Sequence, residues 1–75
     1  MTSEELVELR DVRAFVRTGR ARQTRLRAGL SLSEVAQSVG VSVAAVYRWE
    51  TSDRTPRGEA AVRYWRLLQQ LKVAS

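Results

Sequence analysis

Apolar side chains recur every three or four positions along most of this chain, which is the spacing of one face of an α-helix. At the N-terminal end, this spacing predicts an amphipathic helix over about residues 3–17. Its apolar stripe consists of Leu6, Leu9, Val12, Phe15 and Val16. Thr2 and Glu5 form a capping-box pattern, in which a hydroxyl and a carboxylate three residues later satisfy free backbone amides at the helix start.

The rest of the chain contains four more helical patterns, separated by glycines and short polar segments. They cover about residues 19–28, 32–39, 43–51 and 56–72. Ser31, Ser42 and Thr55 precede three of these segments and are suited to cap them. Pro56 fits the first turn of the last helix, where its missing amide hydrogen costs nothing. Since no period-two strand pattern is present, we predict an all-α fold of five helices.

The composition excludes several classes of function. The 75 residues allow one domain, which we expect to span residues 1–75. The absence of Cys and His removes disulfides, thiolate or imidazole metal sites, and Ser-His or Cys-His catalysis. We therefore expect no metal, no cofactor and no enzymatic activity. No apolar run approaches the roughly 20 residues of a membrane span, and no signal-peptide pattern opens the chain, so a cytoplasmic protein is expected.

The charge of the chain indicates a polyanionic partner. Thirteen basic residues against eight acidic ones give a net charge of +5. Residues 1–16 contain four acids and two arginines, whereas residues 17–75 contain eleven basic residues and four acids. The positive charge therefore belongs to the body of the domain, which is typical of nucleic-acid-binding proteins.

Residues 30–57, LSLSEVAQSVGVSVAAVYRWETSDRTPR, contain two short helical patterns joined by a glycine turn. Helices that cross steeply approach closely only where a small side chain lies at the crossing, and Ala36 fits that position. Gly40 suits the positive φ that a three-residue turn needs. The second helix is expected to be anchored on the core by Val41, Val46 and Trp49.

These residues resemble the helix-turn-helix of the lambda-repressor and Cro family, also called the xenobiotic-response-element family, over about residues 20–71. The family has a small residue and a turn glycine where this chain has Ala36 and Gly40. Its apolar positions are occupied here by Val35, Val39, Val41, Val46 and Trp49. The resemblance implies a small five-helix lambda-repressor-like bundle. Its motif lies at 32–51, between an extra N-terminal helix at 3–17 and a C-terminal helix at 56–72.

In such motifs the second helix enters the major groove of double-stranded DNA, with its N-terminal residues at base edges. The outward face predicted to read bases consists of Ser42, Val43, Ala44, Tyr47 and Arg48. Arg48 can donate two hydrogen bonds to a guanine, and Val43 and Ala44 suit thymine methyl groups. Phosphate contacts are predicted on both sides of this helix, at Ser31, Ser33, Thr51, Arg54 and Arg57.

The resemblance also implies a structural ion pair between Arg25, on the helix before the motif, and Glu50, at the end of the second motif helix. At one position the chain departs from the family pattern. Leu32 stands where a phosphate-binding Gln is usual. That contact is therefore lost, or it is supplied by Ser33, Arg20 or Arg22.

We expect a sequence-specific, double-stranded DNA-binding transcription regulator, similar to a Cro-like or minimal phage-type repressor in a bacterial or phage-infected cell. Two other functions stay open: an antitoxin-like or other protein-interaction module, and an architectural or excision-directing DNA-binding protein. The acidic N-terminal helix is placed away from the DNA and either caps the core or forms a dimer contact. The C-terminal helix, with Trp65, Leu68 and Leu71, is the other candidate surface for a homodimer.

Overall fold

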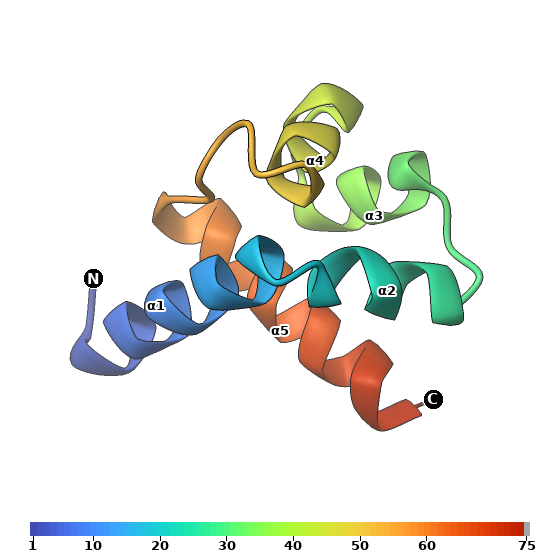
Figure 1. Cartoon of the computed structure of the whole chain (residues 1–75). Helices are drawn as coiled ribbons and strands as arrows, with labels where there is room; N and C mark the ends of the chain where they lie inside the picture. Colours follow the sequence, from blue (N-terminus) through green and yellow to red (C-terminus); the bar gives the residue numbers. More distant parts are fainter. Residues whose placement is uncertain (75) are drawn as a thin grey trace.

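The computed structural model describes residues 1–74 and contains five α-helices and no strand over that range. In chain order the helices are α1 (Ser3–Arg17), α2 (Arg20–Arg27), α3 (Leu32–Val39), α4 (Val43–Glu50) and α5 (Gly58–Ala74). The helices α1 and α5 pack against each other, α3 and α4 form a second pair, and α2 lies against both α1 and α5 (Figure 1). The predicted all-α architecture of five helices is confirmed.

Side chains at the helix starts satisfy the free backbone amides there. The Thr2 hydroxyl accepts from the Glu5 amide at 3.1 Å, and the Glu5 carboxylate accepts from the Thr2 amide at 2.9 Å. Ser31 and Glu34 form the same reciprocal pair at the start of α3. The Ser42 hydroxyl accepts from the amide three residues later at the start of α4. The capping box predicted at Thr2 and the caps predicted at Ser31 and Ser42 are therefore confirmed.

All five helices contribute to one buried core. Its members are Val12, Phe15, Val16, Ala21, Val35, Ala36, Val39, Val46, Trp49, Ala61, Tyr64 and Leu68. Phe15 of α1 packs edge-on against the half-buried Trp65 of α5, with ring centroids 5.3 Å apart at 87°. Aromatic pairs of this geometry stabilise a fold by about 0.5–1.5 kcal/mol beyond their area burial. The core thus fixes α1 on α5 and leaves the far sides of α3 and α4 to solvent.

The last helix starts later than the sequence predicts. It begins at Gly58 and not at Pro56, so the cap predicted at Thr55 is wrong. Gly58 has a φ of +68°, a left-handed conformation that a right-handed helix cannot continue through. Pro56 is instead fully buried, and its carbonyl accepts a hydrogen bond from Arg13 Nε at 3.1 Å. Pro56 therefore anchors the loop before α5 to α1.

The apolar stripe of α1 is shorter than the sequence predicts. Val12 is fully buried and Leu9 is half-buried, but Leu6 is 55% exposed. The N-terminal end of α1 extends beyond the helices that pack against its C-terminal half (Figure 1). The helix itself forms as predicted, over Ser3–Arg17.

Candidate nucleic-acid interface

A tight turn joins α3 to α4, and its geometry depends on Gly40. Gly40 has a φ of +84°, and its amide and that of Val41 both donate to the carbonyl of Ala36, at 2.8 and 3.0 Å. Ala36 is 2% exposed, so no space is left for a larger side chain at this crossing. The turn is also held from α5, because Arg63 Nε donates to the Val39 carbonyl at 2.9 Å. The sequence analysis missed this contribution of Arg63.

The face of α4 predicted to read bases is exposed. Val46 and Trp49, at 0% and 5% exposure, attach the opposite face to the core. The exposed residues include all five predicted ones: Ser42, Val43, Ala44, Tyr47 and Arg48. The Arg48 guanidinium has no hydrogen-bond or ion-pair partner among residues 1–74. The outer surface of α4 therefore presents an apolar tip, a phenol ring and a free cation.

The ion pair that the sequence predicts between Arg25 and Glu50 is present. Arg25 Nε donates to Glu50 Oε2 at 2.6 Å and Arg25 Nη2 to Glu50 Oε1 at 3.0 Å, while Arg25 Nη1 donates to the Leu30 carbonyl at 2.9 Å. The two side chains are 10% and 3% exposed. The hydrogen bonds that Arg25 donates to Glu50 raise the pKa of Arg25, which therefore stays charged. Glu50 is the only acid of α4, so burying it leaves the exposed face of this helix without negative charge.

The start of α3 forms one flank of the exposed face. Ser31 and Ser33 are exposed, and the Ser31 hydroxyl accepts from the Glu34 amide. Glu34 accepts from the Ser31 amide, and these hydrogen bonds lower the pKa of the Glu34 carboxyl. Glu34 is therefore ionised at neutral pH and reduces the positive potential of this flank. Leu32 is half-buried against the core, which explains an apolar residue at this position.

The loop after α4 forms the other flank. Arg54 and Arg57 are exposed and have no partner among the described residues. Thr51 is exposed as well, but its hydroxyl proton is already shared between the carbonyls of Tyr47 and Arg48, at 3.0 and 3.3 Å. The free donors on this flank therefore belong to the two arginines.

The unpaired charges of the fold are mostly positive. Within residues 1–74, the arginines without any polar or aromatic partner are Arg17, Arg22, Arg27, Arg48, Arg54 and Arg57. Several acids, in contrast, are already engaged. Glu8 is paired with Arg66 and Asp11 with Arg10, each at 3.0 Å. The fold therefore keeps cations available to an external anion.

Two of the hollows on the surface of residues 1–74 have volumes of about 210 and 260 Å³. The smaller one lies between α1 and the loop after α4, and Arg13 and Arg17 of α1 line it. The sequence analysis missed both residues because it weighed only the net charge of the N-terminal segment. Within residues 1–74, no three His, Cys, Asp or Glu side chains gather where they could hold a metal ion, and no helix is long and apolar enough to cross a membrane.

Comparison with known proteins identifies the motif. The helix-turn-helix family model matches residues 22–72. The match includes α3, α4 and most of α2 and α5, together with every residue predicted to read bases or bind phosphate, and it excludes α1. Neither a curated protein nor a solved structure matches the chain.

Proposed function

The chain belongs to the lambda-repressor/Cro-like helix-turn-helix family of DNA-binding regulators, and from this premise we propose that it recognises a specific double-stranded sequence. In this proposal α4 enters the major groove with its exposed face against the base edges. The observation that carries the proposal is the composition of that face. It combines an apolar tip at Val43 with a free cation at Arg48, while Glu50, the acid of the same helix, is buried in an ion pair.

Each exposed residue of α4 has a distinct role in this proposal. Arg48 donates two hydrogen bonds to N7 and O6 of a guanine. Val43 and Ala44 contact thymine methyl groups. This contact is favourable because it removes two exposed apolar side chains from water. Tyr47 packs over a base edge or donates its hydroxyl to a phosphate. Ser42 keeps its hydroxyl proton for a base or a phosphate, because its capping bond uses only the oxygen as acceptor.

Contacts to the DNA backbone fix the position of α4 in the groove. On one side the hydroxyls of Ser31 and Ser33 and the free amides at the start of α3 meet a phosphate. On the other side Arg54 and Arg57 each meet a phosphate, and arginine suits this contact because its planar guanidinium donates in pairs. Thr51 lies beside them, but its hydroxyl proton is already donated to a backbone carbonyl, so Thr51 is not a phosphate donor in this proposal.

We further propose that the protein acts as a Cro-like repressor in the cytoplasm. A single small domain that occupies an operator regulates by excluding polymerase or a competing repressor from the same sequence. Two copies related by a two-fold axis would read a palindrome with half-sites about 34–36 Å apart. The candidate surfaces for such a dimer are the exposed start of α1 and the end of α5, where Val73 is 88% exposed. Leu68, which the sequence analysis placed on this surface, is fully buried in the core and cannot contribute to it.

Salt-dependent binding tests this proposal. The full chain is titrated into a fluorescein-labelled 24-base-pair duplex, and the affinity is measured by anisotropy at several salt concentrations. The affinity is expected to fall linearly on a log–log plot, with a slope of about −0.9 for each phosphate contacted. The variant Arg57→Gln is expected to make this slope less negative by about 0.9, because one phosphate contact is lost. The control Arg66→Gln removes the same charge from α5, outside the proposed surface, and is expected to leave the slope unchanged. A chain that binds no duplex contradicts the proposal.

A protein-interaction role is the second candidate, and the exposed apolar residues of α1 favour it. Leu6 and Val7 are 55% and 47% exposed on neighbouring positions of this helix. If this were the function, the substitutions Leu6→Ser and Val7→Ser would abolish binding of a protein partner. Duplex binding would then be weak, and the same for every sequence.

A further inference from the structure

The charges of α1 lie on two separate faces. At 3.6 residues per turn, its three arginines project within about 60° of one another, and three of its acids lie within about 60° on roughly the opposite side. The arginines of the basic face are Arg10, Arg13 and Arg17, and the acids of the opposite face are Glu4, Glu8 and Asp11. The net negative charge of residues 1–16 does not reveal that the basic and acidic side chains of α1 lie on separate faces.

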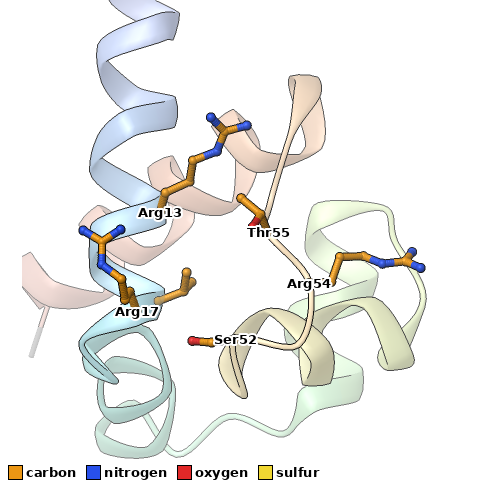
Figure 2. Close-up of a pocket in the computed structure, with 6 residues that line it drawn as sticks. Arg13, Arg17, Ser52, Arg54 and Thr55 are labelled. Atoms are coloured by element: carbon orange, nitrogen blue, oxygen red, sulfur yellow. The ribbon is translucent and has the colours of Figure 1, made fainter.

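The basic face of α1 borders the loop that follows α4. Between them lies a hollow of about 210 Å³, the basic hollow, lined by Arg13, Val16, Arg17, Ser52, Arg54 and Thr55. Figure 2 shows Ser52 and Thr55 on the loop that faces Arg13 and Arg17, with the Ser52 hydroxyl pointing toward α1. The guanidinium of Arg54 points away from α1 and that of Arg17 points away from the loop, so these two arginines form the outer edges of the hollow. No acidic side chain lines it.

The side chains of the basic hollow have hydrogen-bond donors that the fold does not use. Arg17 and Arg54 have no partner among residues 1–74, and the hydroxyls of Ser52 and Thr55 have none either. Arg13 uses only Nε, which donates to the Pro56 carbonyl, so both of its terminal nitrogens are free. Unused guanidinium and hydroxyl donors with no acid beside them suit an oxyanion such as a phosphodiester, which accepts charge-assisted hydrogen bonds.

The position of the basic hollow favours a phosphate of the DNA backbone over a separate ligand. Arg54 belongs both to the hollow and to the loop that directly follows α4, and α1 packs against α4. The major groove is only about 12 Å wide, so a helix lying in it has a phosphate backbone close to each side. A strand that meets Arg54 is therefore close to the rest of the hollow.

We propose that the basic hollow binds one backbone phosphate of the DNA, through Arg17 and Arg13 with Ser52 and Thr55, next to the phosphate held by Arg54. This inference rests on the proposed function. It extends the DNA-binding surface onto α1, which lies outside the residues that the family model matches. It also reverses the prediction that this helix lies away from the DNA.

The test uses the full chain with two 30-base-pair duplexes, one carrying the sequence that the protein selects and one of random sequence. The variant Arg17→Gln is expected to make the slope of log affinity against log salt less negative by about 0.9, which corresponds to about a fivefold loss of affinity at 0.15 M salt. The loss is expected to be equal for both duplexes, because phosphates carry no sequence information. Arg17→Lys keeps the charge and is expected to retain the slope. Arg66→Gln is the charge-matched control, and melting followed by circular dichroism checks that each variant folds.

Phosphate ethylation locates the contact. Ethylating one phosphate removes its charge, so one position at the edge of the site is expected to inhibit binding of the wild-type protein and not of Arg17→Gln. An unchanged ethylation pattern, or equal losses for Arg17→Gln and Arg66→Gln, overturns the inference. If these losses are equal while a sequence is still selected, only the inference fails. If no sequence is selected but Arg17→Gln changes the slope of log affinity against log salt, the phosphate contact stands and only the proposed sequence-specific recognition fails. If no duplex is bound, both fail.

Discussion

Tyr64 of α5 packs against Trp49 of α4, with ring centroids 4.9 Å apart at 36°. The contact holds the buried side of α4, opposite the face proposed to read bases. Tyr64 is 1% exposed, and its hydroxyl has no hydrogen-bond partner among residues 1–74. The ring therefore supports the recognition helix, while the hydroxyl is an uncompensated polar group in the core.

Removing this hydroxyl is expected to stabilise the fold. The substitution Tyr64→Phe keeps the ring and relieves a buried unpaired group, so the free energy of unfolding is expected to rise by about 1 kcal/mol in urea denaturation. Burial also raises the pKa of Tyr64 above the ordinary 10.0, so the neutral form is favoured in the fold. The stability that comes from this preference is fully present below pH 10 and is lost as the pH rises through the raised pKa of Tyr64. Tyr64→Phe is expected to lack this alkaline loss. A less stable Tyr64→Phe would show that the hydroxyl has a partner.

The buried pair of Arg25 and Glu50 predicts a strong asymmetry between single and double substitution. Arg25→Met leaves the Glu50 carboxylate buried without a partner and is expected to cost about 3–5 kcal/mol. The double variant Arg25→Met, Glu50→Leu removes both charges and is expected to recover most of this loss. Thermal or urea denaturation of the four proteins in this cycle measures the coupling. Additive losses in the double variant would contradict this account of the pair.

The capping box of α3 predicts a loss of stability in acid. The amide and hydroxyl of Ser31 lower the pKa of Glu34 below the ordinary 4.5. The ionised form is thus favoured in the fold, and its contribution is present above pH 4.5 and lost as the pH falls through the lowered pKa. Wild-type protein is expected to be more stable than Glu34→Gln at pH 7, with the difference closing in acid. A difference that does not change with pH would assign the stabilisation to the hydrogen bond alone.

Ser52 predicts opposite effects on stability and on DNA binding. Its φ of +61° is the only positive value outside glycine among the described residues. A left-handed conformation costs a residue with a side chain roughly 1–2 kcal/mol. Glycine avoids this cost, but it loses more conformational entropy on folding, so the net gain is smaller. Ser52→Gly is therefore expected to raise the free energy of unfolding by about 0.5–1 kcal/mol. It also removes a hydroxyl from the basic hollow, so duplex affinity is expected to fall. Unchanged affinity would remove Ser52 from the phosphate contact.

Local signals in the sequence were sufficient for most of the fold. The capping boxes at Thr2 and Ser31 and the turn glycine Gly40 each act within a few residues, so pattern and propensity predict them. The ion pair of Arg25 and Glu50 joins residues far apart in the chain, and only the family resemblance indicated it.

The features that the sequence analysis missed depend on how distant segments meet. Pro56 does not start a helix, because Gly58 two residues later is left-handed, and the Pro56 carbonyl instead accepts from Arg13 on α1. The basic hollow could not be predicted from net charge. The positions of Arg13 and Arg17 around a helical wheel separate them from the acids, but only the fold places them beside Ser52.

Selection from a random duplex library at about 0.15 M salt tests the central claim most directly. The wild-type protein is expected to enrich one sequence, and a palindrome with one-turn spacing would identify a dimer on DNA. Arg48→Ala is expected to fold normally and to relax the preference at one guanine position, by about 1–3 kcal/mol of discrimination. Sequencing that finds no enriched motif, with binding that is equal for every duplex, would contradict sequence-specific recognition by α4.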